Sequence, residues 1–187
     1  MIKAGQIAKG MFLLFKNEPH LVVERDLVSP GKGAAFVRMK LRNIKTGFTV
    51  QQTAKTQDSV EECSVEYREA QYQYSDAESY HFMDTQSYDQ VQIAMEGLEE
   101  RKNFLKEGEA YQITYWEQVP IDIKLPTKMV FKVTEAEKAE KGDTVSGAKK
   151  PVVLETGFTV RVPLFIKEGD KVLVNTETGE YQERVND

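Results

Sequence analysis

Hydrophobic and polar residues alternate along many short stretches of this chain, and turn-forming residues separate the stretches. In the clearest run, every second residue from Ala35 to Leu41 is apolar, while Phe36 and three cations occupy the other positions. Strict alternation predicts a half-buried strand, and many short strands with regular turns predict barrels or sandwiches. The other alternating runs are residues 65–67, 71–74, 81–83, 111–115, 121–125, 130–133, 152–154, 158–162 and 171–174.

The pattern divides the chain into three predicted domains, residues 1–64, 65–126 and 127–187. The first boundary marks a change in charge balance, and the second marks Pro126, whose ring restricts the residue before it. Units of this size built from short strands are typically closed barrels. One exception to the strand pattern is residues 92–106, where we expect a short helix at a barrel end. The predicted fold class is all-β, with three small barrels in tandem.

Charge is unevenly distributed along the sequence. The whole chain has a net charge of -5, but residues 1–64 carry a net +4, residues 65–127 a net -8 and residues 128–187 a net -1. No aspartate or glutamate lies between Asp26 and Asp58. A basic stretch without carboxylates attracts phosphate even when the whole molecule is acidic, so this part predicts contact with nucleic acid. Its cations are Lys32, Arg38, Lys40, Arg42, Lys45 and Lys55.

The sequence lacks the residues that several classes of function require. Cys63 is the single cysteine, which excludes an intrachain disulfide and fits a reducing cytoplasm. His20 and His81 are too far apart in sequence for a metal-ligand spacing. Phosphate-binding, dinucleotide-binding and nucleophile-elbow motifs are absent, and the apolar run Met11–Phe15 is too short to span a membrane. We therefore expect no enzyme, no metal, no cofactor and no membrane partner.

The remaining motif is the loop Pro30-Gly31-Lys32-Gly33. Proline fixes φ and Gly31 can adopt positive φ, which predicts a type II turn with Lys32 at the tip of a tight hairpin. Nothing bulky in the loop hides the amine. The alternative is a plain hairpin turn that happens to carry a surface lysine. The basic strand that follows makes a functional loop as well supported as this alternative.

Together with further segments, this loop makes the chain resemble the bacterial elongation factor P family over essentially its whole length. The stretch from Ser29 to Gly47 is similar to the first-domain signature of that family. Further similar segments follow in the same order along the chain, which makes the combined resemblance highly specific. They are residues 71–76, 82–85, 88–90, 141–144, 155–157, 160–165 and 178–181.

The resemblance implies an SH3-like (KOW-like) first barrel and two OB-like barrels, together elongated and L-shaped like a tRNA. It implies a translation factor that binds the ribosome between the peptidyl and exit tRNA sites and stimulates peptide-bond formation, relieving stalling at consecutive prolines. Lys32 matches the loop lysine that family members extend by post-translational modification, supported by Pro30, Gly31 and Gly33. We accordingly expect no cofactor beyond a covalent modification of Lys32.

RNA contacts are expected from three further groups of residues. The first is the basic strand after the loop, the second matches the family's third-domain loop associated with the exit-site codon, and the third falls in its C-terminal motif. These groups are Arg38, Lys40 and Arg42 for tRNA and rRNA; Gly142, Asp143 and Thr144 for the codon; and Tyr181 and Arg184 for a further RNA contact.

The expected partners are the ribosome, its rRNA, the peptidyl-site tRNA and an enzyme that modifies Lys32, with the protein itself a cytoplasmic monomer. Two positions depart from the family pattern: Ser29 stands where many members have lysine, and Val145 replaces a commoner alanine. Two alternatives stay open. One is a general OB-type RNA-binding protein or RNA chaperone, and the other is a divergent paralogue of the factor.

Overall fold

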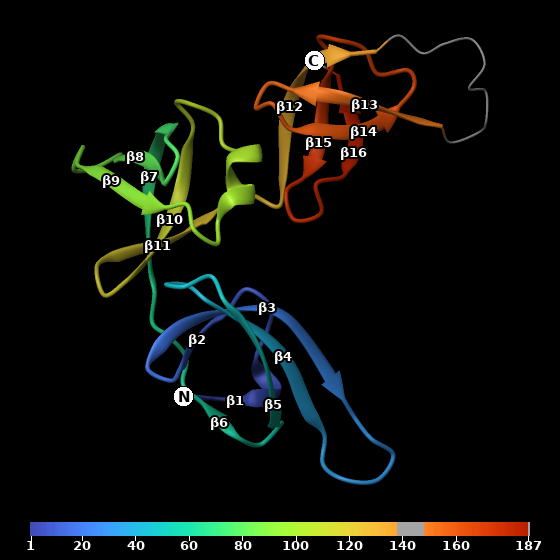
Figure 1. Cartoon of the computed structure of the whole chain (residues 1–187). Helices are drawn as coiled ribbons and strands as arrows, with labels where there is room; N and C mark the ends of the chain where they lie inside the picture. Colours follow the sequence, from blue (N-terminus) through green and yellow to red (C-terminus); the bar gives the residue numbers. More distant parts are fainter. Residues whose placement is uncertain (138–147, 187) are drawn as a thin grey trace. The chain divides into compact units, whose positions relative to one another are not determined.

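The chain folds into strands joined by turns, as the computed structural model shows for residues 1–137 and 148–186 (Figure 1). Within those residues the strands form three antiparallel sheets and one two-stranded pair. The prediction of an all-β fold is therefore confirmed. The division at residues 64 and 126 stays a prediction, since the first two sheets belong to one compact unit and the third to another.

The first sheet has the strand order β2-β3-β4-β5, and the pair β1–β6 accompanies it. Alternate residues of β4 point inward, where Val37, Met39 and Leu41 join a buried cluster with Ala4 and Leu13. The alternation predicted for this strand is thus confirmed. The bounds are β1 Ile2–Lys3, η1 Ala4–Gln6 (a 3-10 turn), β2 Phe12–Phe15, β3 Glu18–Val28, β4 Phe36–Asn43, β5 Thr49–Lys55 and β6 Ser59–Val60.

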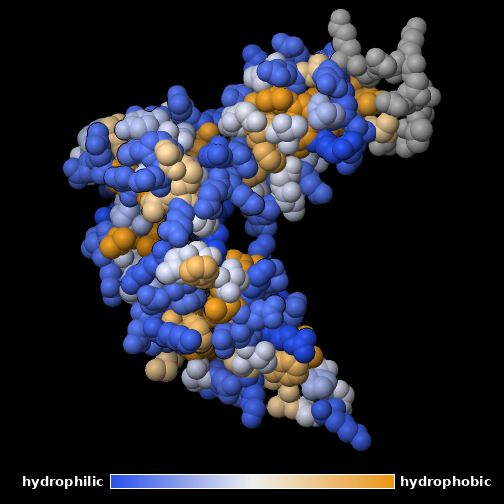
Figure 2. Space-filling view, viewed as in Figure 1, coloured by the Kyte–Doolittle hydropathy of each residue, from blue (hydrophilic) through white to orange (hydrophobic). Residues whose placement is uncertain are grey.

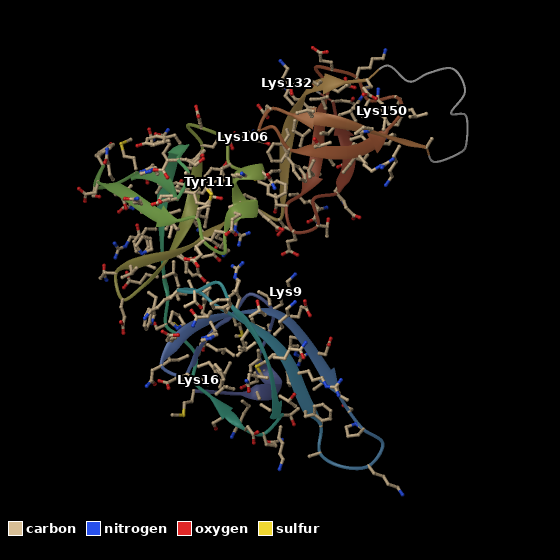
Figure 3. The ribbon with its side chains drawn as sticks, in the orientation of Figure 1. Lys9, Lys16, Lys106, Tyr111, Lys132 and Lys150 are labelled. Carbon is tan, nitrogen blue, oxygen red and sulfur yellow. The ribbon has the colours of Figure 1, made fainter. Side chains whose placement is uncertain are left out.

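The second sheet has the order β11-β10-β7-β8-β9. Its core is aromatic: Phe82 is buried against the edge of Tyr111 (labelled in Figure 3), and the buried Tyr80 hydroxyl donates to the carbonyl of Leu98 over 2.8 Å. The bounds are β7 Glu66–Ser75, β8 Ser79–Asp84, β9 Gln90–Ala94, β10 Ala110–Trp116 and β11 Val119–Lys124.

The third sheet has the order β14-β13-β12-β15-β16. Residues 100–109, which precede it in sequence, belong to the same compact unit. Phe104 from that segment packs on Phe131 and Phe158, with ring centroids 6.1 and 5.2 Å away. The Lys106 ammonium (Figure 3) lies 5.6 Å from the Phe131 ring centre. The bounds are β12 Lys128–Ala136, β13 Lys149–Leu154, β14 Thr159–Pro163, β15 Lys171–Asn175 and β16 Tyr181–Val185.

The helix predicted for residues 92–106 is wrong. This segment contains the end of β9, a turn and the five-residue 3-10 segment η2, Glu99–Asn103. Gly97 sits in the turn at φ +76°, a conformation that an α-helix cannot contain. Leu98 and Leu105 are both buried, as their apolar character suggested, but the segment reaches these positions without a continuous helix.

Candidate nucleic-acid interface

The Lys32 loop joins the ends of two paired strands and projects from the first sheet (Figure 1). Val28 at the end of β3 pairs with Phe36 at the start of β4, so residues 29–35 form the loop. Lys32 is exposed, and apart from the two chain neighbours of Gly31 no described residue has an atom within 4 Å of the place that a Cβ on Gly31 would take. In Figure 2 the outermost part of this loop is hydrophilic, with pale and apolar residues next to it. The amine is therefore accessible to a partner.

The predicted type II turn is wrong in detail. That turn needs positive φ at Gly31, but in this loop the positive φ is at Gly33, with +112°. The connection is seven residues long, so it is a wider loop than a tight hairpin. Its exit is anchored instead, because the Thr56 backbone N–H and hydroxyl both donate to the Ala35 carbonyl, over 3.0 and 3.2 Å. Lys32 is thus presented from a fixed base.

The three cations of β4 differ in environment. Arg38 is exposed, and its guanidinium lies 5.4 Å from the Phe36 ring centre. The Lys40 ammonium forms a 3.1 Å ion pair with Glu24 of β3. Arg42 donates from Nη1 to the Gly97 carbonyl over 2.7 Å. A role in RNA binding stays a prediction for all three, and the surroundings favour Arg38 as the cation most available to a phosphate.

Arg42 connects the first sheet to the turn after β9. There the two backbones approach closely: a Cβ on Gly97 would lie 3.2 Å from the Gly47 Cα. Residues from the first two sheets also meet in a buried apolar cluster of Phe12, Cys63 and Ile121, on which Trp116 packs. The Lys45 ammonium lies 5.3 Å from the centre of the Trp116 ring. The hydrogen bond of Arg42 therefore belongs to a packed junction between the first two sheets.

Replacing Arg42 by alanine should lower the free energy of unfolding by about 1 to 3 kcal/mol, because a charged donor to a part-buried carbonyl is lost. Urea unfolding followed by Trp116, the single tryptophan, measures this change. Arg38→Ala is the matched control and should change the value by less than about 0.5 kcal/mol, since Arg38 is exposed. Equal stabilities of the two variants would contradict the role given to Arg42.

The residues predicted in the third domain divide into two sets. Gly142, Asp143 and Thr144, with the neighbouring Val145, lie outside the described residues. Tyr181 and Arg184 lie on β16, where Tyr181 is half-buried and Arg184 is exposed. The pKa of Tyr181 is raised, chiefly by burial. Arg184 donates to the Asn186 side chain over 3.1 Å and lies 3.9 Å from Asp170, so its charge is partly engaged within the third sheet.

The cysteine and the two histidines have contacts that fit a structural role. Burial raises the pKa of the Cys63 thiol, which disfavours the thiolate that a nucleophile needs. The His20 ring lies 2.9 Å from the Glu18 carbonyl oxygen, and the His81 ring lies 2.7 Å from Asp76. In residues 1–137 and 148–186 no group of three or more metal-ligating side chains gathers. None of the helical segments in that part of the chain has the length and apolarity to cross a bilayer.

The sequence analysis missed Glu24 and Asp26, two residues of β3 that lie beside the cations of β4. They precede the loop in sequence, but antiparallel pairing places Glu24 opposite Lys40 and Asp26 opposite Arg38. The stretch that lacks carboxylates in sequence therefore has carboxylates beside it in space. Alternation along β3 was the signal that would have found them, since Glu24 and Asp26 are two residues apart and both exposed.

Comparison with known proteins gives one consistent family along the chain. Residues 3–60 match the elongation factor P (EF-P) KOW-like domain, residues 65–123 its OB domain, and residues 129–184 the model called elongation factor P, C-terminal. The structure agrees, because among the described residues each of these ranges coincides with one of the three larger sheets, and the two-stranded pair β1–β6 accompanies the first.

Individual relatives match over their whole length. Elongation factor P of Treponema denticola is 54% identical over 186 residues, covering 100% of both chains. The protein of the same name from Treponema pallidum (strain Nichols) is 56% identical over 187 residues, again covering 100% of both. Among solved structures, eukaryotic translation initiation factor 5A from Methanococcus jannaschii matches with a TM-score of 0.49 and 22% identity, over 66% of this chain and 90% of that chain.

Proposed function

The chain belongs to the elongation factor P family, and from this premise we propose that it relieves ribosomes stalled at consecutive prolines through Lys32. Family membership establishes a non-enzymatic factor that acts in translation and associates with the ribosome. The proposal adds the site on the ribosome, the residue that acts and the kind of stall that is relieved.

The exposed position of Lys32 on an anchored loop carries the proposal. Proline is conformationally restricted, so the reacting ends of two tRNAs misalign when prolines follow one another. A long cationic arm on Lys32 would lie along the end of the peptidyl-site tRNA and hold it by phosphate and sugar contacts. The factor would occupy the space between the peptidyl and exit sites, and an enzyme would lengthen Lys32 by covalent modification.

Positioning alone accounts for an effect of the required size. About 3 kcal/mol of alignment changes a rate by roughly two orders of magnitude, and well-oriented reactants gain more than this in other systems. No acid–base group on this chain is needed, because the peptidyl transferase centre supplies the chemistry. Arg38 and Lys40 would add salt-dependent contacts to the RNA backbone next to the loop.

Timed synthesis of a peptide with three consecutive prolines on purified ribosomes tests the proposal. Adding the protein should shorten the delay at the prolines and leave a proline-free peptide unchanged. Equal times with and without the protein would contradict the proposal. A general RNA-binding protein would instead bind ribosomes and free single-stranded RNA with similar affinity, which filter binding measures directly.

A further inference from the structure

The outer face of the first sheet has three neighbouring rows of side chains with different chemistry. Glu24 and Asp26 of β3 stand opposite Lys40 and Arg38 of β4. On the other side, Lys40 pairs with Gln51 of β5, and Arg38 pairs with Thr53 of the same strand. Residues directly opposite in antiparallel strands have Cβ atoms about 4.5 to 5.5 Å apart, so each cation has a carboxylate on one side and a neutral polar group on the other.

These rows line one open groove of about 310 Å³. Its lining includes both carboxylates and both cations, together with Met39 and the polar residues of β5. All the charged groups here are at least partly exposed, so none is committed to the barrel core. The groove is therefore a surface on which an external ligand meets two positive and two negative charges at the same time.

This balance weakens the attraction of the face for phosphate. Lys40 already has an anion 3.1 Å away in Glu24, so a phosphate that approaches Lys40 competes with that carboxylate. Asp26 stands beside Arg38 and repels the same phosphate. A cation that is paired before binding also contributes less to the counterion release that drives RNA association.

We propose that Glu24 and Asp26 restrain the binding of this face to RNA phosphates, so that free RNA is held only weakly. This inference rests on the proposed function, in which the same face contacts RNA beside the Lys32 loop. With the cations balanced, binding depends on the additional contact made by Lys32, and this contact exists only at the tRNA end. The two carboxylates are thus specificity-determining residues that favour the ribosomal site over the large excess of other RNA.

The test compares the double variant Glu24→Gln/Asp26→Asn with the matched control Glu61→Gln/Glu62→Gln. All four carboxylates are exposed and belong to the same barrel, and both variants raise the net charge by the same amount. Glu61 and Glu62 do not line the groove. Thermal unfolding of both variants confirms that they fold, and fluorescence anisotropy then measures their binding to a short single-stranded RNA of mixed sequence.

Glu24→Gln/Asp26→Asn should bind this RNA about 5- to 20-fold more tightly than the unaltered protein at low salt. The slope of the logarithm of the binding constant against the logarithm of the salt concentration should become steeper by about one to two. The control should change affinity by less than about twofold, because its charges lie away from the groove. Equal tightening by both variants, or no tightening by the first, would overturn the inference.

The outcome is separable from the proposed function, because free RNA binding is measured without ribosomes. Peptide synthesis across consecutive prolines could prove independent of the protein while Glu24→Gln/Asp26→Asn still binds the RNA more tightly. In that case the proposed function would fail and the restraint by the two carboxylates would stand. If Glu24→Gln/Asp26→Asn left RNA affinity unchanged while the protein still relieved the proline delay, the reverse would hold.

Discussion

Replacing Lys32 by alanine should slow synthesis across three consecutive prolines roughly 100-fold relative to the active, natively produced protein, a change of about 2.7 kcal/mol in the activation free energy. The reason is the loss of the one side chain that would reach the tRNA end from the anchored loop. Rapid-quench measurement of the tripeptide gives the rate, and synthesis of a proline-free peptide should be unaffected.

Two controls make this result specific to the amine. Lys16→Ala removes an exposed lysine from the turn between β2 and β3, outside the basic stretch, and should keep the full rate. Lys32→Arg keeps the positive charge but removes the amine that can be extended, so it should be nearly as slow as Lys32→Ala. If Lys32→Ala and the active protein gave the same rate, the role of the loop would be wrong.

The second large effect concerns the core of the third sheet, where Phe131 is fully buried. Phe131→Ala should lower the free energy of unfolding of this unit by about 3 to 5 kcal/mol, because a large ring is lost and a cavity remains. The ring also supports Phe104 and underlies the Lys106 ammonium, so little can collapse into the space. A loss of this size is a large part of the stability of a small domain.

Hydrogen exchange resolved by peptide measures this loss over the third sheet. Phe165→Ala is the matched control in the same unit, since Phe165 is 58% exposed and its truncation should cost less than about 0.5 kcal/mol. Similar loss of protection in both variants would show that Phe131 is not the centre of this core.

The strands could be predicted from the sequence because burial imposes a period of two on β4 and its neighbours. The helix over residues 92–106 could not be judged in the same way. Leu98 and Leu105 suggested one helical face, but tertiary packing places Leu98 beside Tyr80 and sends Phe104 to a different core. Gly97 was the overlooked signal, because a glycine in a helix interior is unfavourable.

The site was predictable in its position and not in its surroundings. The exposed lysine and the strand after it followed from local sequence, since a loop rich in glycine and an alternating run are local features. The charge balance of the face did not follow, because Glu24 and Asp26 are brought to Lys40 and Arg38 by strand pairing across the loop. Likewise, the attachment of Arg42 to Gly97 joins residues 55 positions apart.

A photo-crosslink from the loop to tRNA on the ribosome would be the most direct measurement of how the loop acts. A benzophenone side chain at Ala34, which is exposed and close to Lys32, leaves the amine in place. On ribosomes stalled at consecutive prolines it should link to the 3′ end of the peptidyl-site tRNA, whereas the same group at Glu61 should not. Crosslinks from Ala34 to ribosomal protein alone, with the tRNA end unlabelled, would contradict the idea that Lys32 acts there.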